Sequence, residues 1–521
     1  MKPISLIRGF VTVGVWTLLS RILGFVRDIM IAAFLGAGPV AEAFLIAFSL
    51  PNMFRRFFAE GAFNMAFIPI FSKKLEKNDG AGEFARDAFA GMALLLTGFT
   101  ALGVIFMPGL VWLMASGFAE DNRFDLATQY GRIAFPYILF ISLSALISGV
   151  LNATGRFMAA AAAPVLLNVI FITAVIAAIL TGASEAAHPD RVIGMTLAWA
   201  VPVGGIAQLA LVWLAARRAG YDFRPRRPRL TPDLKRLAAI AAPAALAGGV
   251  VQINLLIGRQ VASHFDGAVA WLSYADRLYQ LPLGVVGIAI GVVLLPDLSR
   301  RLGANDTAGG RDAFNRAAEV TLALTIPAAV ALIAIPVPLV SVLFERGAFT
   351  SDDTAATALA VAVYGLGLPA FVLQKVLQPL YFAREDTRRP FFFAVVAMLI
   401  NAALAVGLAS VIGYLGAAFG TTLAAWAMVV LLWRGSRGMG DAAVLDDRFR
   451  RRFWRILVAS AVMGVVVWWL AAGMTLLLGA ATIRYAALLF LVVVGIVTYF
   501  GVGQLVGAFQ ISEFRSAMRR R

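Results

Sequence analysis

The chain has 521 residues, of which 61% are hydrophobic and 14% are charged, and its formal net charge is +16. This apolar fraction exceeds what a water-soluble protein buries in its core, so it excludes an ordinary soluble fold and indicates that lipid is the main solvent. Because the sequence contains no cysteine, it also excludes disulfides, thiolate metal sites and a cysteine nucleophile.

Apolar segments long enough to cross a bilayer recur along the chain. A spanning helix needs roughly 20 mostly apolar residues, and the segments 88–113, 134–151 and 486–507 are examples. The basic first residues lead into a long apolar run without a small-residue cleavage site, so we expect this first segment to be retained as a span. We expect about 14 transmembrane helices and an all-α integral membrane protein.

Lys and Arg residues are distributed unevenly over the connections between these spans. One set of connections is strongly basic, namely 73–77, 217–236, 300–301, 388–389, 448–455 and 519–521. The opposite set holds single basic residues, namely Arg123, Arg191, Arg346 and Arg484. By the positive-inside rule the first set is cytoplasmic, which places both termini in the cytoplasm. The net charge is thus explained by topology, and no nucleic-acid partner is expected.

An internal repeat relates two parts of the chain. The matching residues are Pro69, Lys73 and Lys74 with Pro296, Arg300 and Arg301; Arg86–Phe89 with Arg311–Phe314, letter for letter; Pro136 with Pro369; and Asn168 with Asn401. Basic loops match basic loops, and six spans return the chain to the same side, so the repeats are predicted to be parallel. Such paired bundles usually bind a substrate near the membrane midplane and work by alternating access.

The repeat predicts the domain organisation. We expect an N-lobe of six spans at residues 1–220, a proline-containing cytoplasmic linker at 221–236, and a C-lobe of six spans at 237–439. Residues 440–521 add two further spans and a basic C-terminal tail.

Ionisable residues inside the predicted spans are the candidate functional residues. A charge at the bilayer centre costs about 2.5 kcal/mol or more, so such residues usually face protein or a water-filled path. The strongest candidates are Arg21, Arg27, Arg55 and Arg277, and the others are Asp28, Glu42, Arg56, Glu60, Asp276, Lys375 and Arg259. Cations predominate in this set, and the fixed donor fork of arginine suits phosphate, so we expect an anionic ligand.

Structural explanations of the same residues remain open. Arg27 with Asp28, or Asp276 with Arg277, would also form satisfied ion pairs, and residues near the span ends would reach the interface by snorkelling. The two histidines are far apart in the sequence, so no metal site is expected. No paired carboxylates or activated nucleophile indicate an enzyme.

Several motifs carry a family resemblance. They are Ser20–Asp28 (SRILGFVRD), Leu50–Arg56 (LPNMFRR), Phe58–Phe63 (FAEGAF), Phe135–Leu139 (FPYIL) and Tyr274–Leu278 (YADRL). Together they resemble the MurJ/MviN family of bacterial lipid II flippases over essentially the whole chain. The resemblance implies the fold of the multidrug/oligosaccharidyl-lipid/polysaccharide exporter superfamily, with two six-helix lobes and two additional helices that help to form a hydrophobic groove for a polyprenyl tail.

The resemblance also implies a function and a site. It implies translocation of lipid II, an undecaprenyl-diphosphate-linked disaccharide-peptide, from the cytoplasmic to the periplasmic leaflet of the bacterial inner membrane for cell-wall synthesis. It implies that Arg21, Arg27, Arg55 and Arg277 are required cavity arginines and that Glu42 is an acidic cavity residue. Expected partners are lipid II, membrane lipids and cell-wall synthesis proteins. No cofactor is expected, and the energy source is expected to be the membrane potential or an ion gradient.

Other functions are open at this point. One is export of a drug or of another lipid-linked oligosaccharide by a related fold, although the excess of arginine disfavours a cationic drug. A membrane enzyme of the lipid-linked sugar pathway would require carboxylates gathered on one membrane face. A scaffold for the cell-wall machinery would explain the basic loops but not the arginines within spans.

Overall fold

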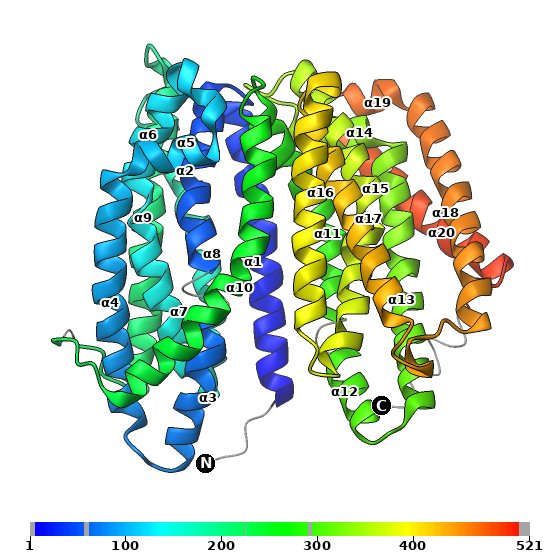
Figure 1. Ribbon diagram of the computed structural model, residues 1–521. Coiled ribbons are helices and arrows are strands. Elements are labelled where there is room, and N and C mark those ends of the chain that lie inside the picture. Colours follow the sequence, from blue (N-terminus) through cyan, green and yellow to red (C-terminus); the bar gives the residue numbers. More distant parts are fainter. Residues whose placement is uncertain (1–5, 57–61, 225, 290–293, 510–521) are drawn as a thin grey trace. The chain divides into compact units, whose positions relative to one another are not determined.

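The computed structural model describes residues 6–56, 62–224, 226–289 and 294–509, which form helices and connecting segments without any strand (Figure 1). Ten helices in this described part are long and apolar enough to cross a membrane. The predicted all-α membrane fold is therefore confirmed, while the expected number of about 14 spans stays a prediction. One candidate residue, Glu60, lies outside the described residues.

The chain divides into two compact units. The first comprises Met1–Ala270 and Arg346–Phe349, and the second comprises Trp271–Glu345 and Thr350–Arg521. These units are defined by packing and not by the sequence repeat, so the lobe boundaries expected near residues 220 and 237 stay a prediction.

The helices of the first unit are long and joined by short connections. Their bounds are α1 Leu6–Leu35, α2 Pro39–Arg55, α3 Ala62–Glu76, α4 Ala81–Ile105, α5 Met107–Met114, η2 Ser116–Glu120, α6 Asn122–Ala134, α7 Tyr137–Ala153, α8 Phe157–Leu180, η3 Ala183–Glu185, α9 Pro189–Arg218 and α10 Pro232–Ala262.

The remaining helices belong mostly to the second unit, and the longest of them, α15, has 32 residues. Their bounds are α11 Ala268–Ala289, α12 Leu295–Gly303, α13 Thr307–Ala334, α14 Pro336–Phe344, α15 Ser351–Phe382, α16 Arg388–Ile412, α17 Leu415–Ser436, η5 Asp441–Ala443, α18 Asp447–Gly473, α19 Thr475–Gly479 and α20 Arg484–Leu505.

The order of these helices repeats. The series α1 to α9 has its counterpart in α10 to α17, if α6 and α7 together are compared with the continuous helix α15. The repeated sequence falls at the same place in both series, because Arg86–Phe89 lies near the start of α4 and Arg311–Phe314 lies near the start of α13. The repeat seen in the sequence is thus a repeat of helical elements.

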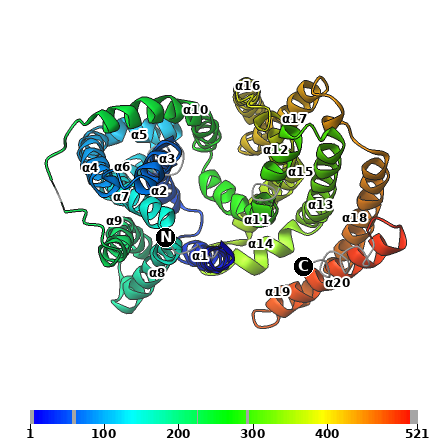
Figure 2. The same ribbon diagram turned by 90° about the horizontal axis from the view of Figure 1, so that it is seen from below.

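In the first unit, α1 packs on α8, α8 on α9, α9 on α7 and α2 on α6, while α10 lies beside α3 (Figure 2). Small residues allow these close approaches. A Cβ atom at Gly204 of α9 would lie 2.4 Å from Leu167 Cδ1, and one at Gly205 would lie 2.8 Å from Tyr137 Cδ2. Such contacts are typical of membrane helices, which associate through packing of small residues and not through hydrophobic exclusion of water.

The connection between α9 and α10 is fixed on α4. The Phe223 side chain is 1% exposed, and its ring centroid lies 5.4 Å from that of Phe89. Arg226 forms an ion pair with the buried carboxylate of Asp87, which belongs to the repeated motif. The described linker residues Phe223 and Arg226 are therefore anchored on α4.

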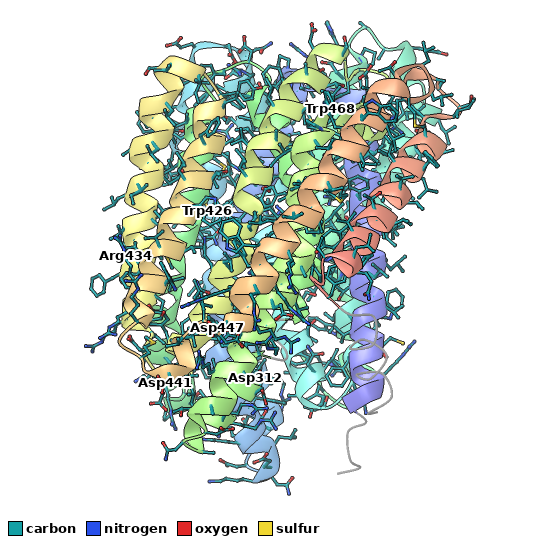
Figure 3. All side chains as sticks on the ribbon, turned by 90° about the vertical axis from the view of Figure 1, so that its right-hand side faces the viewer. Asp312, Trp426, Arg434, Asp441, Asp447 and Trp468 are labelled. Atoms are coloured by element: carbon teal, nitrogen blue, oxygen red, sulfur yellow. The ribbon has the colours of Figure 1, made fainter. Side chains whose placement is uncertain are left out.

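In the second unit, contacts follow the order α16, α17, α15, α13, α18 and α20, with each helix packed on the next. A Cβ atom at Gly416 would lie 2.6 Å from the backbone nitrogen of Ala409, so α17 and α16 approach each other closely. Figure 3 shows α18 running from Asp447 at one end of the unit toward Trp468 near the other. The pair α18 and α20 thus forms the edge of this unit.

Candidate functional site

Arg27 of α1 lies inside the first unit, and each of its three guanidinium nitrogens donates a hydrogen bond. Its Nε and Nη2 atoms donate to Asp28 Oδ1 over 2.9 and 2.7 Å, and its Nη1 donates to Asn168 Oδ1 over 2.9 Å. The residue is 8% exposed. Ion pairs of this kind tolerate burial only when further hydrogen bonds satisfy the charges, as they do here. The predicted pair of Arg27 with Asp28 is present.

Aromatic rings complete the surroundings of this guanidinium. Its carbon lies 5.5 Å from the centroid of Phe171 and 5.9 Å from that of Phe48. A cation is attracted to the negative face of an aromatic ring, most strongly where water is excluded. Arg27 is therefore held in one orientation by α2 and α8 as well as by its own helix.

Asn168 of α8 is a further member of this group that was not among the candidate residues predicted from the sequence. It is 6% exposed, and its Nδ2 atom donates to the backbone oxygen of Ser20 over 2.9 Å while its Oδ1 accepts from Arg27. The signal was its recurrence as Asn401, which is also fully buried in an apolar helix. A buried amide at corresponding positions of a repeat indicates a structural or functional requirement.

Arg21 differs from Arg27 in its surroundings. Its side chain is exposed, and among the described residues it forms no hydrogen bond or ion pair. It lies on the same helix, six residues before Arg27. Within the first unit, α1 therefore presents one enclosed guanidinium and one accessible guanidinium.

Arg55 and Arg56 lie at the end of α2. Arg55 is half-buried and Arg56 is exposed at the C-cap. Pro51 lies inside the same helix and is buried, so the backbone oxygen of Ala47 lacks its usual helical donor. The candidate Arg259 of α10 also belongs to the first unit and is half-buried.

Glu42 of α2 forms a second buried charged group, separate from that of Arg27. One carboxylate oxygen accepts from Arg123 Nη1 over 2.8 Å, and the other accepts from the backbone nitrogen of Val269 over 2.9 Å. Glu42 is 1% exposed and Arg123 is 5% exposed. In this conformation Glu42 joins α2 to α6 and to the start of α11. Its expected contact with substrate stays a prediction.

Arg123 is the centre of this group. Besides Glu42, it contacts Asp121 over 2.6 Å and Asp266 over 3.0 Å, and it lies 4.5 Å from the ring centroid of Phe118. Burial alone would raise the pKa of Asp121, but the hydrogen bonds and charge of Arg123 outweigh burial and lower it. The sequence identifies Arg123 only as a loop residue, because nothing in it relates Arg123 to Glu42.

In the second unit, Asp276 and Arg277 lie half-buried on α11. Asp276 accepts a hydrogen bond from Gln280, one turn further along the helix. The neighbouring Tyr279 stacks on Phe371 of α15 with 5.1 Å between ring centroids. Lys375, one turn beyond that phenylalanine, is exposed.

These observations define a class of protein. Its helices are long and apolar, and they enclose paired ionisable side chains such as Arg27 with Asp28 and Glu42 with Arg123, an arrangement typical of multi-span membrane transporters. The family model for lipid II flippase MurJ matches residues 31–495. The chain therefore belongs to the lipid II flippase MurJ family, and the resemblance recognised in the sequence is confirmed.

Relatives and solved structures agree with this assignment. A protein of Rhizobium tropici, described as a probable lipid II flippase MurJ, is 43% identical over 99% of this chain and 97% of its own length. A solved structure of lipid II flippase MurJ in an inward closed conformation has a TM-score of 0.76 at 24% identity, covering 95% of this chain and 98% of that chain. An inward-facing multidrug resistance MATE family transporter of the MOP superfamily has a TM-score of 0.67 at 16% identity, covering 81% and 95%. These two likenesses show the fold.

Proposed function

We propose that this protein translocates lipid II across the bacterial inner membrane by alternating access. The observation that carries the proposal is the similarity to MurJ proteins over nearly the whole chain. The physical requirement is consistent with it, because a diphosphate-linked headgroup needs cationic partners while an isoprenoid tail remains in lipid. The protein acts as a transporter without a chemical step on its substrate.

Binding of the diphosphate is assigned to Arg21, Arg27, Arg55 and Arg277. Arginine presents a planar fork of donors that matches phosphate oxygens in pairs and stays charged when buried. The exposed side chain of Arg21 leaves its guanidinium accessible to an anion. Arg27 supplies a guanidinium whose orientation is set in advance by its aromatic neighbours.

Translocation is tested with the purified protein in liposomes that contain fluorescent lipid II. Exposure of the headgroup on the outer surface is followed with a membrane-impermeant quencher. Arg21→Ala is expected to lower the rate at least about tenfold, which corresponds to the loss of one charge-assisted hydrogen bond. The matched control is Arg218→Ala, because Arg218 is an exposed arginine at the end of α9 outside the candidate set.

Two results would count against this function. The first is a translocation rate in wild-type liposomes no higher than in empty liposomes. The second is equal translocation of an unrelated lipid-linked oligosaccharide, which would favour a general exporter of such lipids. Full activity of Arg21→Ala would show that Arg21 is not part of the binding site, but it would leave the proposed function standing.

Coupling to the membrane potential is the proposed energy source. Movement of one elementary charge through 100 mV supplies about 2.3 kcal/mol, which is enough to bias a transport cycle. In the same liposomes, a potassium gradient together with valinomycin imposes a known membrane potential. Translocation that is unchanged after the potential is collapsed would exclude this source and leave an ion gradient to be tested.

Orientation and partners complete the proposal. Both termini are assigned to the cytoplasm on the basis of the basic connections. A reporter fused to each terminus that is active only in the periplasm should remain inactive, and activity at either end would contradict the assignment. Cell-wall synthesis proteins are the proposed protein partners, and crosslinking in cells tests this.

A further inference from the structure

A turn of the same sequence and the same shape follows α3 in the first unit and α12 in the second. Residues 72–79 read SKKLEKND, and residues 299–306 read SRRLGAND. Asn78 and Asn305 have φ angles of 53° and 58°, in the left-handed region that residues other than glycine rarely adopt. The two turns are therefore copies of one element within the internal repeat.

The basic residue of each turn has two acidic partners, and one of these partners differs between the copies. Lys74 Nζ lies 3.3 Å from Asp79 Oδ2, and the corresponding distance from Arg301 to the aspartate of its own turn is 3.4 Å. The second partner of Arg301 is Asp297, four residues earlier on the same helix, at 2.8 Å. The second partner of Lys74 is Asp233 at the start of α10, at 2.9 Å. The turn after α3 is thus tied to α10, whereas the turn after α12 pairs with an acid of its own helix.

By sequence, α10 belongs to the second series of helices, because it is the counterpart of α1 in the repeat. Whereas α1 packs on α8 of its own series, α10 lies beside α3 of the first series. A Cβ atom at Gly91 of α4 would lie 3.1 Å from Leu234 Cδ2, and the hydroxyl of Thr231 caps α10 by accepting from the backbone nitrogen of Leu234 over 3.3 Å. The start of α10 is therefore held against helices of the other series.

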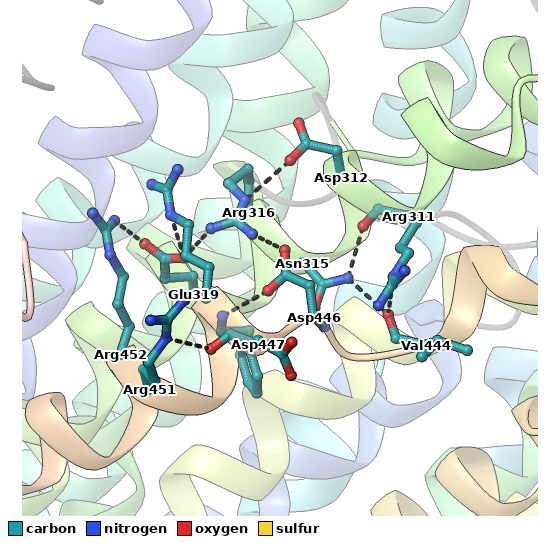
Figure 4. Close-up of polar contacts among 12 residues, drawn as sticks. Arg311, Asp312, Asn315, Arg316, Glu319, Val444, Asp446, Asp447, Arg451 and Arg452 are labelled. Atoms are coloured by element: carbon teal, nitrogen blue, oxygen red, sulfur yellow. Dashed lines mark hydrogen bonds and ion pairs between the residues drawn. The ribbon is translucent and has the colours of Figure 1, made fainter.

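The segment that precedes α10 is anchored more firmly than the start of the helix. Arg226 pairs with Asp87 of α4, whose side chain is 5% exposed. The second unit holds the segment before α18 in a comparable way, since Asn315 of α13 accepts from the backbone nitrogen of Asp446 over 2.9 Å (Figure 4). The side chain of Asp233, by contrast, is 43% exposed. A buried ion pair is costly to break from one side, and an exposed one contributes little free energy, so the contact of Asp233 opens more readily than this anchor.

We propose that Lys74 and Asp233 form a latch, which holds the start of α10 on α3 in one conformation of the transport cycle and has to open for the cycle to proceed. This inference rests on the proposed function, because alternating access requires the two series of helices to rearrange their contacts. A helix that packs on the series to which it does not belong by sequence is the element at which these contacts change. The anchored linker keeps the start of α10 close to α3 while the latch is open, so that the latch can close again.

The experiment locks the latch with a crosslink. The chain contains no cysteine, so two introduced thiols are the only ones that react. Lys74→Cys with Asp233→Cys is joined by a reducible bis-methanethiosulfonate linker about as long as the two original side chains, and translocation of fluorescent lipid II in liposomes is measured before crosslinking, after it and after reduction. Crosslinking should lower the rate at least about tenfold, because a transporter locked in one state cannot complete alternating access. Reduction should restore the rate.

The matched control is Lys74→Cys with Asp79→Cys. Asp79 belongs to the same turn as Lys74 and its side chain is 70% exposed, so the same linker joins no separate helices there. The rate of this variant should be the same before and after crosslinking. Addition of lipid II should lower the crosslinking yield of the pair at 74 and 233 but not that of the control pair, because turnover separates only the first pair.

A charge exchange tests the same contact without a crosslink. Lys74→Asp places a carboxylate beside Asp233 and Asp79 and should hold the latch open. The translocation rate should fall by up to about fivefold, the factor that corresponds to the loss of one exposed ion pair. Lys74→Asp combined with Asp233→Lys should recover most of this loss, because the pair forms again with its charges exchanged.

The outcomes separate the latch from the proposed function. Unchanged translocation after crosslinking of positions 74 and 233 would overturn the latch. An equal loss in the control pair would also overturn it, because the arrest would then come from modification of the turn. A charge exchange that recovers nothing would show that the ion pair itself has no role. Failure of the unmodified wild type to translocate lipid II would instead refute the proposed function.

Discussion

Replacement of Glu42 by alanine tests the buried charged group that joins α2, α6 and the start of α11. The substitution removes a carboxylate that is 1% exposed and leaves Arg123, 5% exposed, without its innermost partner. Breaking a buried ion pair from one side typically costs about 3–5 kcal/mol. Because Arg123 keeps Asp121 and Asp266, the cost should fall near the lower end of this range.

The effect should appear as a lower melting temperature of the purified protein in detergent. For a compact unit of this size, 1 kcal/mol corresponds to about 2 °C, so a cost near 3 kcal/mol should lower the melting temperature by roughly 6 °C. Glu42→Gln should give a smaller fall, because its amide oxygen still accepts from the backbone nitrogen of Val269. Asp266→Asn is the matched control, since Asp266 contacts the same guanidinium from a side chain that is 95% exposed.

An exposed ion pair contributes only about 0–1 kcal/mol, so the control should melt within about 2 °C of the wild type. The reasoning is wrong if Glu42→Ala melts as the wild type does. It is also wrong if Asp266→Asn has the larger effect, because burial would then not decide the strength of these contacts.

Three further predictions concern the first unit. Arg27→Lys keeps the charge but loses the fork that reaches both the carboxylate and the amide, so translocation should fall at least about tenfold at normal expression. Arg123 lowers the pKa of Asp121 below its ordinary value of 3.8. The stability that the contact of Asp121 with Arg123 contributes is therefore complete above pH 3.8 and is lost as the pH falls through the lower folded-state pKa. The melting temperature of Asp121→Asn should accordingly be less sensitive to acid than that of the wild type. Gly117→Ala would place a Cβ atom 2.5 Å from the backbone of Ser263, and thermal melting should report a cost of about 1–3 kcal/mol. Wild-type stability of this variant would show that the backbone adjusts.

Spans and adjacent pairs are predictable from the sequence. In lipid, backbone groups must be satisfied within each segment, so a long apolar run predicts a helix without knowledge of its neighbours. The pair of Arg27 and Asp28 is expected because a charge inside a span needs a partner, and not from adjacency alone, since consecutive side chains on a helix do not face each other. The repeated sequence at Arg86 and Arg311 predicts a repeated element because identical residues recur in the same order.

Contacts between distant residues are not predictable in this way. Asn168 lies 141 residues from Arg27, and Arg123 lies 81 residues from Glu42. Hydropathy indicates that a charge inside a helix needs a partner, but it does not identify the helix that supplies it. Glu319 is a further example: the positive-inside rule accounts for the basic segment 448–455 without any partner, yet Arg448 and Arg452 of that segment pair with this acid.

The enclosure of Arg27 affects how an anion would bind there. Its guanidinium is already neutralised by Asp28 and hydrogen-bonded to Asn168, so a phosphate would have to displace these partners and not simply occupy a vacant positive site. The net free energy of phosphate binding is then the difference between the contacts that Arg27 would make with the phosphate and those that it already makes with Asp28 and Asn168. Binding at such a position is inherently weak and readily reversed, which suits a transporter because a substrate held too tightly could not be released on the other side of the membrane.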